Sequence, residues 1–182
     1  MALKIYLAGP DVFLPDAIEV GRRKRELCEE YGFEGLFPID TGSAKDDAVE
    51  IFRANCALMR RADVGLLNLT PFRGPSADAG TVFELGHLFA LGKPAFGYSS
   101  DGATYHEKVA RECGPLIERD ELWWDRGGYL VEDFALFDNL MIARAIAEAG
   151  GTVTMIPEEG EGSLAAFRAF EASLEGLRSR FG

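Results

Sequence analysis

The sequence predicts a single α/β domain, residues 1–182, in which helices cover both faces of a parallel, doubly wound sheet of about five strands. Short apolar segments alternate with longer amphipathic segments along the chain, as they do when each strand is followed by a crossover helix. The short segments are apolar at nearly every position rather than at every second one, which is typical of strands covered on both faces. No repeat or long linker divides the chain.

The first half of the chain holds three expected strands and two helices. Residues 3–8 are apolar and end at a Gly-Pro turn, which indicates the first strand. Residues 16–31 place apolar side chains among charges and stop before a glycine, which predicts a helix. Residues 33–39 are the second strand, closed by a proline, and residues 64–69 are the third. The clearest helix is 46–61, where apolar residues recur at three- and four-residue steps.

The second half repeats the alternation. Residues 80–91 predict a helix that a glycine stops, and residues 93–98 predict the fourth strand. Residues 104–113 and 139–149 are helical in character, and two glycines end the second of them before a fifth strand at 152–156. This succession is typical of flavodoxin-like and Rossmann-like sheets. The remaining segments are an irregular stretch at 114–138, with both tryptophans, and a final amphipathic helix at 164–181.

Composition excludes two classes of partner. The chain is 47% hydrophobic and 27% charged with a net charge of −11, so it predicts a folded domain with an acidic surface. That surface repels nucleic-acid polymers and anionic membranes. No apolar run approaches the ~20 residues of a membrane span, and the N-terminus lacks the apolar core of a signal peptide. The widely spaced Cys28, Cys56 and Cys113 favour reduced, mostly buried thiols in a cytoplasmic protein.

The candidate site lies where strands end. Ligands of parallel sheets bind beyond the carboxyl ends of the strands, where residues 9–13, 40–42 and 70–80 are expected. Glu84 follows the third of these loops in an apolar helix, where the free N–H groups of the helix start favour the ionised carboxylate. An ionised and partly desolvated Glu is a candidate nucleophile. With Asp78 six residues earlier, the pair suits chemistry at a glycosidic bond.

Structural interpretations compete with this one. Thr81-x-x-Glu84 also fits a capping box, and Asp78 also fits a helix N-cap. The basic run at 22–25 is expected to form a solvated helix face. Two histidines without ligand spacing argue against a catalytic zinc site, and neither of the common glycine-rich phosphate-binding motifs is present.

Four further residues carry two interpretations each. Phe13 and Phe72 follow strands at the candidate site, but isolated aromatic residues more often belong to a core. Tyr6 lies in a buried strand and needs a partner for its hydroxyl, which need not be a substrate. Asn55 lies beside the apolar stripe of its helix, where a local hydrogen bond is as well supported as a functional one.

At these residues the chain resembles the nucleoside 2-deoxyribosyltransferase family. Lys4-Ile5-Tyr6-Leu7-Ala8-Gly9-Pro10 with Phe13 is similar to the family's first strand and loop. Ala62-Asp63-Val64, leading to Thr70-Pro71-Phe72-Arg73-Gly74, is similar to its third strand and loop. Asp78-x-Gly80-Thr81-x-x-Glu84-Leu85-Gly86 resembles its catalytic segment, and Asn139-Leu140-Met141 resembles its short motif near the C-terminus.

The resemblance implies a two-step transfer. Glu84 would attack C1′ of a 2′-deoxynucleoside and displace the base, leaving a covalent deoxyribosyl–enzyme intermediate that passes the sugar to another purine or pyrimidine base. Asp78 would hold the sugar, and Tyr6 would orient the Glu84 carboxylate. The substrate-binding residues that the resemblance implies are Gly9, Phe13, Asn55, Phe72, Asn139 and Met141.

The resemblance also implies an assembly and a cellular role. Asn139 would reach the 5′-hydroxyl of a substrate in a neighbouring subunit, which requires a homo-oligomer, a dimer at least. The implied partners are deoxynucleosides and free nucleobases, and the implied role is nucleotide salvage in the cytoplasm. The chemistry calls for no metal and no organic cofactor.

Two alternatives remain open at this stage. One is an N-glycosidase on the same fold, acting on a nucleoside or a nucleoside 5′-monophosphate, in which water accepts the sugar. The other is a sensor that binds a nucleoside or nucleotide without catalysis.

Overall fold

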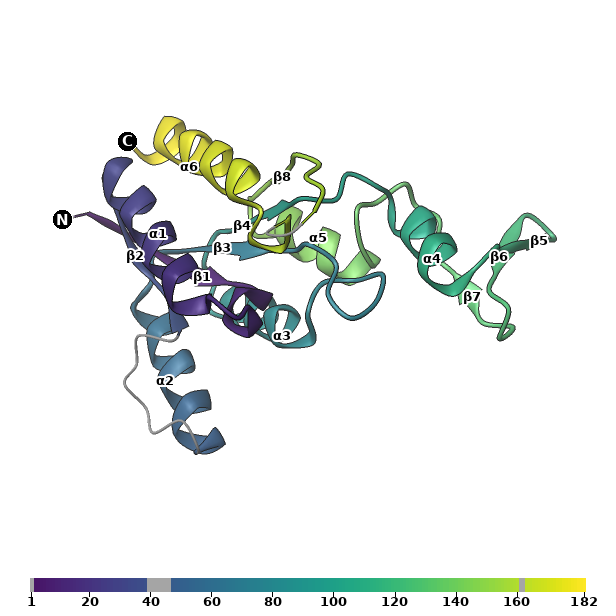
Figure 1. The fold of residues 1–182 in the computed structure, drawn as a ribbon, viewed down its shortest axis with the longest axis horizontal. Helices are drawn as coiled ribbons and strands as arrows, with labels where there is room; N and C mark the ends of the chain where they lie inside the picture. Colours follow the sequence, from purple (N-terminus) through teal and green to yellow (C-terminus); the bar gives the residue numbers. More distant parts are fainter. Residues whose placement is uncertain (1, 39–46, 161–162) are drawn as a thin grey trace.

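The computed structural model describes residues 2–38, 47–160 and 163–182. Within them, one sheet of five parallel strands has the order β2-β1-β3-β4-β8 (Figure 1). The order reverses between β1 and β3, so the carboxyl ends of these neighbours form the edge at which such folds bind ligands. The predicted α/β class is confirmed. The strands are β1 (Leu3–Ala8), β2 (Phe33–Leu36), β3 (Val64–Asn68), β4 (Ala95–Ser99) and β8 (Val153–Met155).

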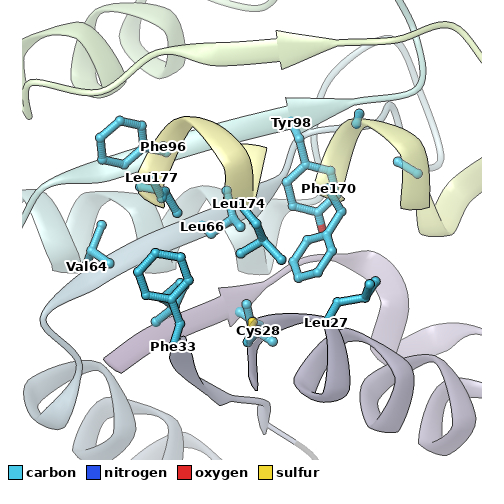
Figure 2. Close-up of a cluster of buried hydrophobic side chains, with 14 of the residues drawn as sticks. Leu27, Cys28, Phe33, Val64, Leu66, Phe96, Tyr98, Phe170, Leu174 and Leu177 are labelled. Atoms are coloured by element: carbon cyan, nitrogen blue, oxygen red, sulfur yellow. The ribbon is translucent and has the colours of Figure 1, made fainter. Parts of the chain in front are cut away.

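Each face of the sheet buries its own core, because successive strand residues point to opposite faces. Ile5 and Leu7 of β1 join a cluster covered by α1 and α6, as Figure 2 shows for the side chains of the two helices and the strands beneath them. Tyr6 and Ala8 join the opposite cluster, covered by α2, α3 and α5. These helices are α1 (Ala17–Glu30), α2 (Ala48–Arg61), α3 (Ala79–Ala90), α5 (Leu140–Glu148) and α6 (Phe167–Phe181).

Two elements fall three residues short of their predicted bounds. The strand expected at 33–39 ends at Leu36, because Pro38 has no N–H for the sheet ladder and Phe37 turns its ring onto Gly21 of α1. A Cβ on Gly21 would lie 2.5 Å from that ring. The helix expected from residue 164 begins at Phe167, because Ala166 adopts a left-handed conformation with φ of 48° after the short turn η3 (Ser163–Ala165).

A second, antiparallel sheet in residues 114–138 was missed by the sequence prediction. It has the order β5-β6-β7, with β5 (Ile117–Arg119), β6 (Leu122–Trp124) and β7 (Leu130–Val131). Strands of two or three residues are too short to show a period-two pattern. Figure 1 shows this sheet and α4 (Tyr105–Cys113) extending away from the main sheet.

The expectation of a solvated basic face at 22–25 is wrong for one residue. Lys24 is 0% exposed, whereas its neighbours Arg22 and Arg23 form exposed ion pairs with nearby glutamates. Lys24 lies one helical turn from the buried Val20 and Cys28, so the period of the helix turns it toward the core. A run of four basic residues in a row necessarily covers more than one face of a helix.

Lys24 organises a buried polar network at the carboxyl edge of the sheet. Its Nζ donates to Asp11 Oδ1 at 2.7 Å and to Tyr98 Oη at 2.8 Å. Asn68 Nδ2 donates to both Asp11 oxygens at 3.2 Å and to the carbonyl of Leu164 at 2.7 Å. The network therefore ties the loop after β1 to β3, β4 and the start of the C-terminal segment.

Two of the three cysteines are buried, as expected, and the third is not. Cys28 and Cys56 are buried, Cys113 is exposed, and all three are free. In the described part of the chain, no helix is long and apolar enough to cross a membrane.

The buried ion pair makes a stability prediction. Lys24→Met removes the counter-charge of Asp11, which is 2% exposed, and we expect a loss of about 3–5 kcal/mol in the free energy of unfolding. Arg23→Met removes only exposed pairs, and we expect a loss below about 1 kcal/mol. Urea denaturation of both variants measures the difference. Equal losses of unfolding free energy in the two variants would contradict the stabilising role of the buried Lys24 network.

Candidate active site

The centre of the site is a hydrogen bond between strand β1 and helix α3. Tyr6, which is 0% exposed, donates its hydroxyl to Glu84 Oε1 at 2.5 Å. Glu84 stands in the second turn of α3, one residue before the buried Leu85. Burial in this apolar setting raises the pKa of Glu84 to about 7, although the Tyr6 hydrogen bond lowers it. Near neutral pH, the protonated and ionised forms of Glu84 are therefore present in comparable fractions.

Asp78 has both a structural position and an electrostatic effect on Glu84. Its Oδ2 accepts from the backbone N–H of Thr81 at 3.0 Å and from the Thr81 hydroxyl at 3.3 Å, so it caps α3. The capping-box interpretation of Glu84 is wrong, because α3 starts at Ala79 and Glu84 bonds to Tyr6. The charge of Asp78 contributes to the raised pKa of Glu84. The two predicted carboxylates therefore share one site.

A stack of two aromatic rings and a guanidinium covers the loops after β1 and β3. The rings of Phe13 and Phe72 lie 5.3 Å apart and 7° from parallel. Arg73 places its guanidinium 5.3 Å from the centre of the Phe13 ring and 4.7 Å from that of Phe72. Phe13 is 54% exposed, so it is not a core residue and offers an apolar surface at the sheet edge. Arg73 belongs to the predicted loop after β3, but no role of its own was predicted for it.

Gly9 allows the first of these loops to approach β3. A Cβ at Gly9 would lie 2.6 Å from the Cβ of Asn68, closer than real side chains come. Glycine is therefore required between β1 and the turn η1 (Pro10–Phe13). This close approach places Phe13 beside Phe72.

Asn55 has an unsatisfied acceptor. Its Oδ1 is buried and finds no hydrogen-bond partner among the described residues. An unpaired buried acceptor costs roughly 1–3 kcal/mol, so a ligand that donates to it would recover that energy. Burial and the neighbouring Glu84 raise the pKa of the Tyr6 hydroxyl, and Cys56, the next residue on α2, lies close enough to add to this effect. Residues 40–42, also expected at this site, lie outside the described residues.

Asn139 and Met141 are not brought to Glu84 within one chain. They line a groove of about 780 Å³ between α3 and α5, together with Val82 and Phe89 of α3. Glu84 comes two residues after Val82, about 200° around the helix, so it faces away from this groove. Met141 is 71% exposed. Either these two residues serve another purpose or they act in the site of a second subunit.

Asp138 and Glu132 fix the start of α5 by hydrogen bonds, and the sequence did not point to either residue. Asp138 is 1% exposed and accepts from Ser76 Oγ at 2.5 Å and from the N–H of Ala77 at 2.9 Å. Glu132 accepts from Asn139 Nδ2 at 2.7 Å. Neither lies in a motif or at the end of a strand that the sequence predicts, so only the folded chain reveals them. In the described ranges, no group of three or more His, Cys, Asp or Glu side chains is arranged to hold a metal.

Fold and site together define a class: an α/β protein that holds a partly desolvated glutamate at the switch point of a parallel sheet, beside a second carboxylate. The model of the family described as nucleoside 2-deoxyribosyltransferase matches residues 5–141. The chain belongs to this family. The family assignment that the sequence motifs suggested is thereby confirmed.

Individual relatives agree with this assignment. The chain is 30% identical to a 2-desoxiribosyltransferase from Leishmania mexicana, with a TM-score of 0.65 and coverage of 95% of this chain and 97% of that one. It is 31% identical over 175 residues to an uncharacterized protein of Schizosaccharomyces pombe, covering 83% of this chain and 80% of the relative. A conserved protein from Enterococcus faecalis V583, at 22% identity and a TM-score of 0.58, shares the fold.

The Tyr6–Glu84 hydrogen bond makes a prediction that needs no substrate. Tyr6→Phe keeps the ring and removes the donor that favours the carboxylate, so the pKa of Glu84 should rise above its value of about 7. NMR titration of protein labelled with ¹³C at glutamate Cδ measures this pKa, and Glu84→Gln assigns the signal. Tyr31→Phe removes a hydroxyl that donates to Glu171 and Glu175 instead, and it should leave the pKa of Glu84 unchanged. A lower Glu84 pKa in Tyr6→Phe would overturn the assigned role.

Proposed function

We propose that the protein transfers a 2-deoxyribosyl group from a purine or pyrimidine 2′-deoxynucleoside to a second base through a covalent intermediate on Glu84. The observation that carries the proposal is the Tyr6–Glu84 contact, which holds a desolvated carboxylate at the switch point of the sheet beside Asp78. A nucleophile must be ionised, and a pKa of about 7 leaves a large ionised fraction at neutral pH. Membership of the family supports the same chemistry.

The proposed reaction has two displacements at C1′. A Glu84 oxygen attacks C1′ as the glycosidic bond breaks, and the bonding electrons leave with the base, which takes up a proton. A second base then attacks C1′ through a ring nitrogen and loses its proton, and the Glu84 carboxylate departs. Each step inverts C1′, so the product keeps the configuration of the substrate. Positive charge develops on the sugar in both transition states, and the nearby Asp78 carboxylate favours it.

The remaining predicted residues take positions around the substrate. Asp78 holds the 3′-hydroxyl of the sugar with the oxygen atoms that the helix cap leaves accessible. The exposed face of the Phe13 and Phe72 stack packs on the base, and Asn55 supplies its unpaired oxygen to a donor on the base or sugar. Asn139 and Met141 meet the 5′ end of a substrate held by a neighbouring subunit. The apolar groove between α3 and α5 supplies a surface on which a second copy would dock.

Trapping tests the covalent step. A 2-fluoro sugar analogue slows the second displacement, and intact-mass spectrometry should show one sugar adduct per chain that peptide mapping places on Glu84. Glu84→Gln should lose base exchange by several orders of magnitude, as removal of other nucleophiles does. Glu29→Gln, an exposed change on α1, should keep full activity. Active enzyme that forms no adduct would overturn the covalent mechanism.

The acceptor distinguishes transfer from hydrolysis. Incubating a 2′-deoxynucleoside with and without a second free base should give base release that depends on the acceptor and yields a new nucleoside. Fast base release at a rate that does not depend on the acceptor would instead identify an N-glycosidase. Binding without any release, unchanged by Glu84→Gln, would identify a sensor.

Subunit mixing tests the shared site. Asn139→Ser retains a helix cap and loses the amide, and Glu84→Gln loses the nucleophile. Each variant alone should be impaired, whereas mixed oligomers should regain activity, because one of their sites combines an intact Glu84 with an intact Asn139. No recovery after verified mixing would show that both residues act within one chain.

A further inference from the structure

We propose that Glu132 is a specificity-determining residue, one that restricts this enzyme to nucleosides whose 5′ end is uncharged. The inference rests on the proposed function, in which Asn139 meets the 5′ end of the substrate. It adds a residue outside every motif of the sequence and a physical reason for rejecting nucleoside 5′-monophosphates.

The N-terminus of α5 would ordinarily suit a phosphate. The first N–H groups of a helix have no partner within the helix and point outward with the positive end of its dipole. Phosphate groups bind at such ends. The site proposed for the 5′ end of the substrate, at Asn139, is the N-cap of α5. Whether α5 accepts a phosphate depends on whether its donors are free.

Side chains of the same chain occupy these donors. The N–H of Leu140 donates to Glu132 Oε2 at 2.8 Å, and Asn139 Nδ2 donates to Glu132 Oε1 at 2.7 Å. The N–H of Asn139 donates to Asp138 Oδ1 at 2.7 Å, and the N–H of Met141 donates to Asn139 Oδ1 at 3.0 Å. Glu132 thus uses both its oxygens to close the helix end. A phosphate would have to displace a carboxylate to reach a backbone donor.

The charge around the start of α5 also disfavours a phosphate. Glu132 and Asp138 bring two carboxyl groups to it, and both contribute, after burial, to the raised pKa of the nearby Tyr105. Among the described residues near this helix end, Lys108 offsets one of these two negative charges, because it lies close to Asp138 while it donates to the carbonyl of Phe137 at 2.8 Å. Arg144 pairs with Glu148 at 2.9 Å. A phosphate dianion at Asn139 would therefore meet a net negative charge.

A hydroxyl fits the same place. The Asn139 carboxamide has one further N–H and one further lone pair beyond the bonds that the structure shows, and a hydroxyl can both donate and accept. Glu132 also fixes the orientation of this amide, because only Nδ2 can donate to a carboxylate. Glu132 thus presents a defined donor and acceptor to a neutral 5′-hydroxyl and repels a phosphate.

Substrate discrimination tests this role. The measurement is kcat/KM for base release from a 2′-deoxynucleoside and from its 5′-monophosphate. In wild type, kcat/KM for the nucleoside should exceed kcat/KM for the monophosphate by about 100-fold or more, which corresponds to a few kcal/mol of unfavourable interaction with the phosphate. Glu132→Gln removes the charge and keeps an acceptor, and it should narrow the ratio by about tenfold, mainly by lowering KM for the monophosphate. Asp133→Asn, an exposed neutralisation at the next residue, should leave the ratio unchanged.

A second measurement avoids any variant that fails to fold. With wild-type enzyme, added salt screens the repulsion, so KM for the monophosphate should fall with ionic strength while KM for the nucleoside stays constant. An unchanged ratio in folded Glu132→Gln, or a wild-type preference for the monophosphate, would overturn the role of Glu132 and leave the glycosidic chemistry standing. Failure to release base from either substrate would instead overturn the proposed function.

Discussion

The hydrogen bond from Tyr6 to Glu84 is the interaction on which the site depends. It joins the central strand β1 to α3, and it supplies a donor to a carboxylate that burial would otherwise protonate. Because Tyr6 is wholly buried and its own pKa is raised by that burial, it remains a donor throughout the neutral range. The sheet provides the rigidity, and the tyrosine provides a donor that stabilises the charged form of a partly buried carboxyl group.

Around this pair, the carboxyl edge of the sheet is built from close approaches between loops. Gly9 lets the loop after β1 contact β3, and the pair between Lys24 of α1 and Asp11 fixes that loop. Phe13 of the same loop therefore stacks on Phe72. On the other side of α3, the buried Asp138 connects the segment before Asp78 to the start of α5. The buried Asp138 carboxylate therefore connects the segment that leads into α3, which carries Glu84, to the start of α5, which carries Asn139 and Met141.

Sequence patterns and sequence motifs predicted different parts of this protein. Periodicity placed the strands and helices of the main sheet to within one or two residues in most cases, because the central strands β3 and β4 are buried on both faces and most of the covering helices are amphipathic. It missed β5, β6 and β7, whose two or three residues each carry no detectable period. It also misjudged Lys24, since the side of a helix that each basic residue faces depends on where the helix packs.

The sequence by itself determined the fold class and membership of the family and predicted Glu84 and Asp78 as the carboxylates of the site, because these depend on local pattern and on residue types at short spacing. The tertiary structure decided which interpretation of each residue holds: Asp78 caps α3, Glu84 bonds to Tyr6, and Asn139 faces a groove on the opposite side of the helix. Glu132 and Asp138 emerged only there. Burial, charge proximity and donor satisfaction are properties of contacts between distant segments, and no local pattern encodes them.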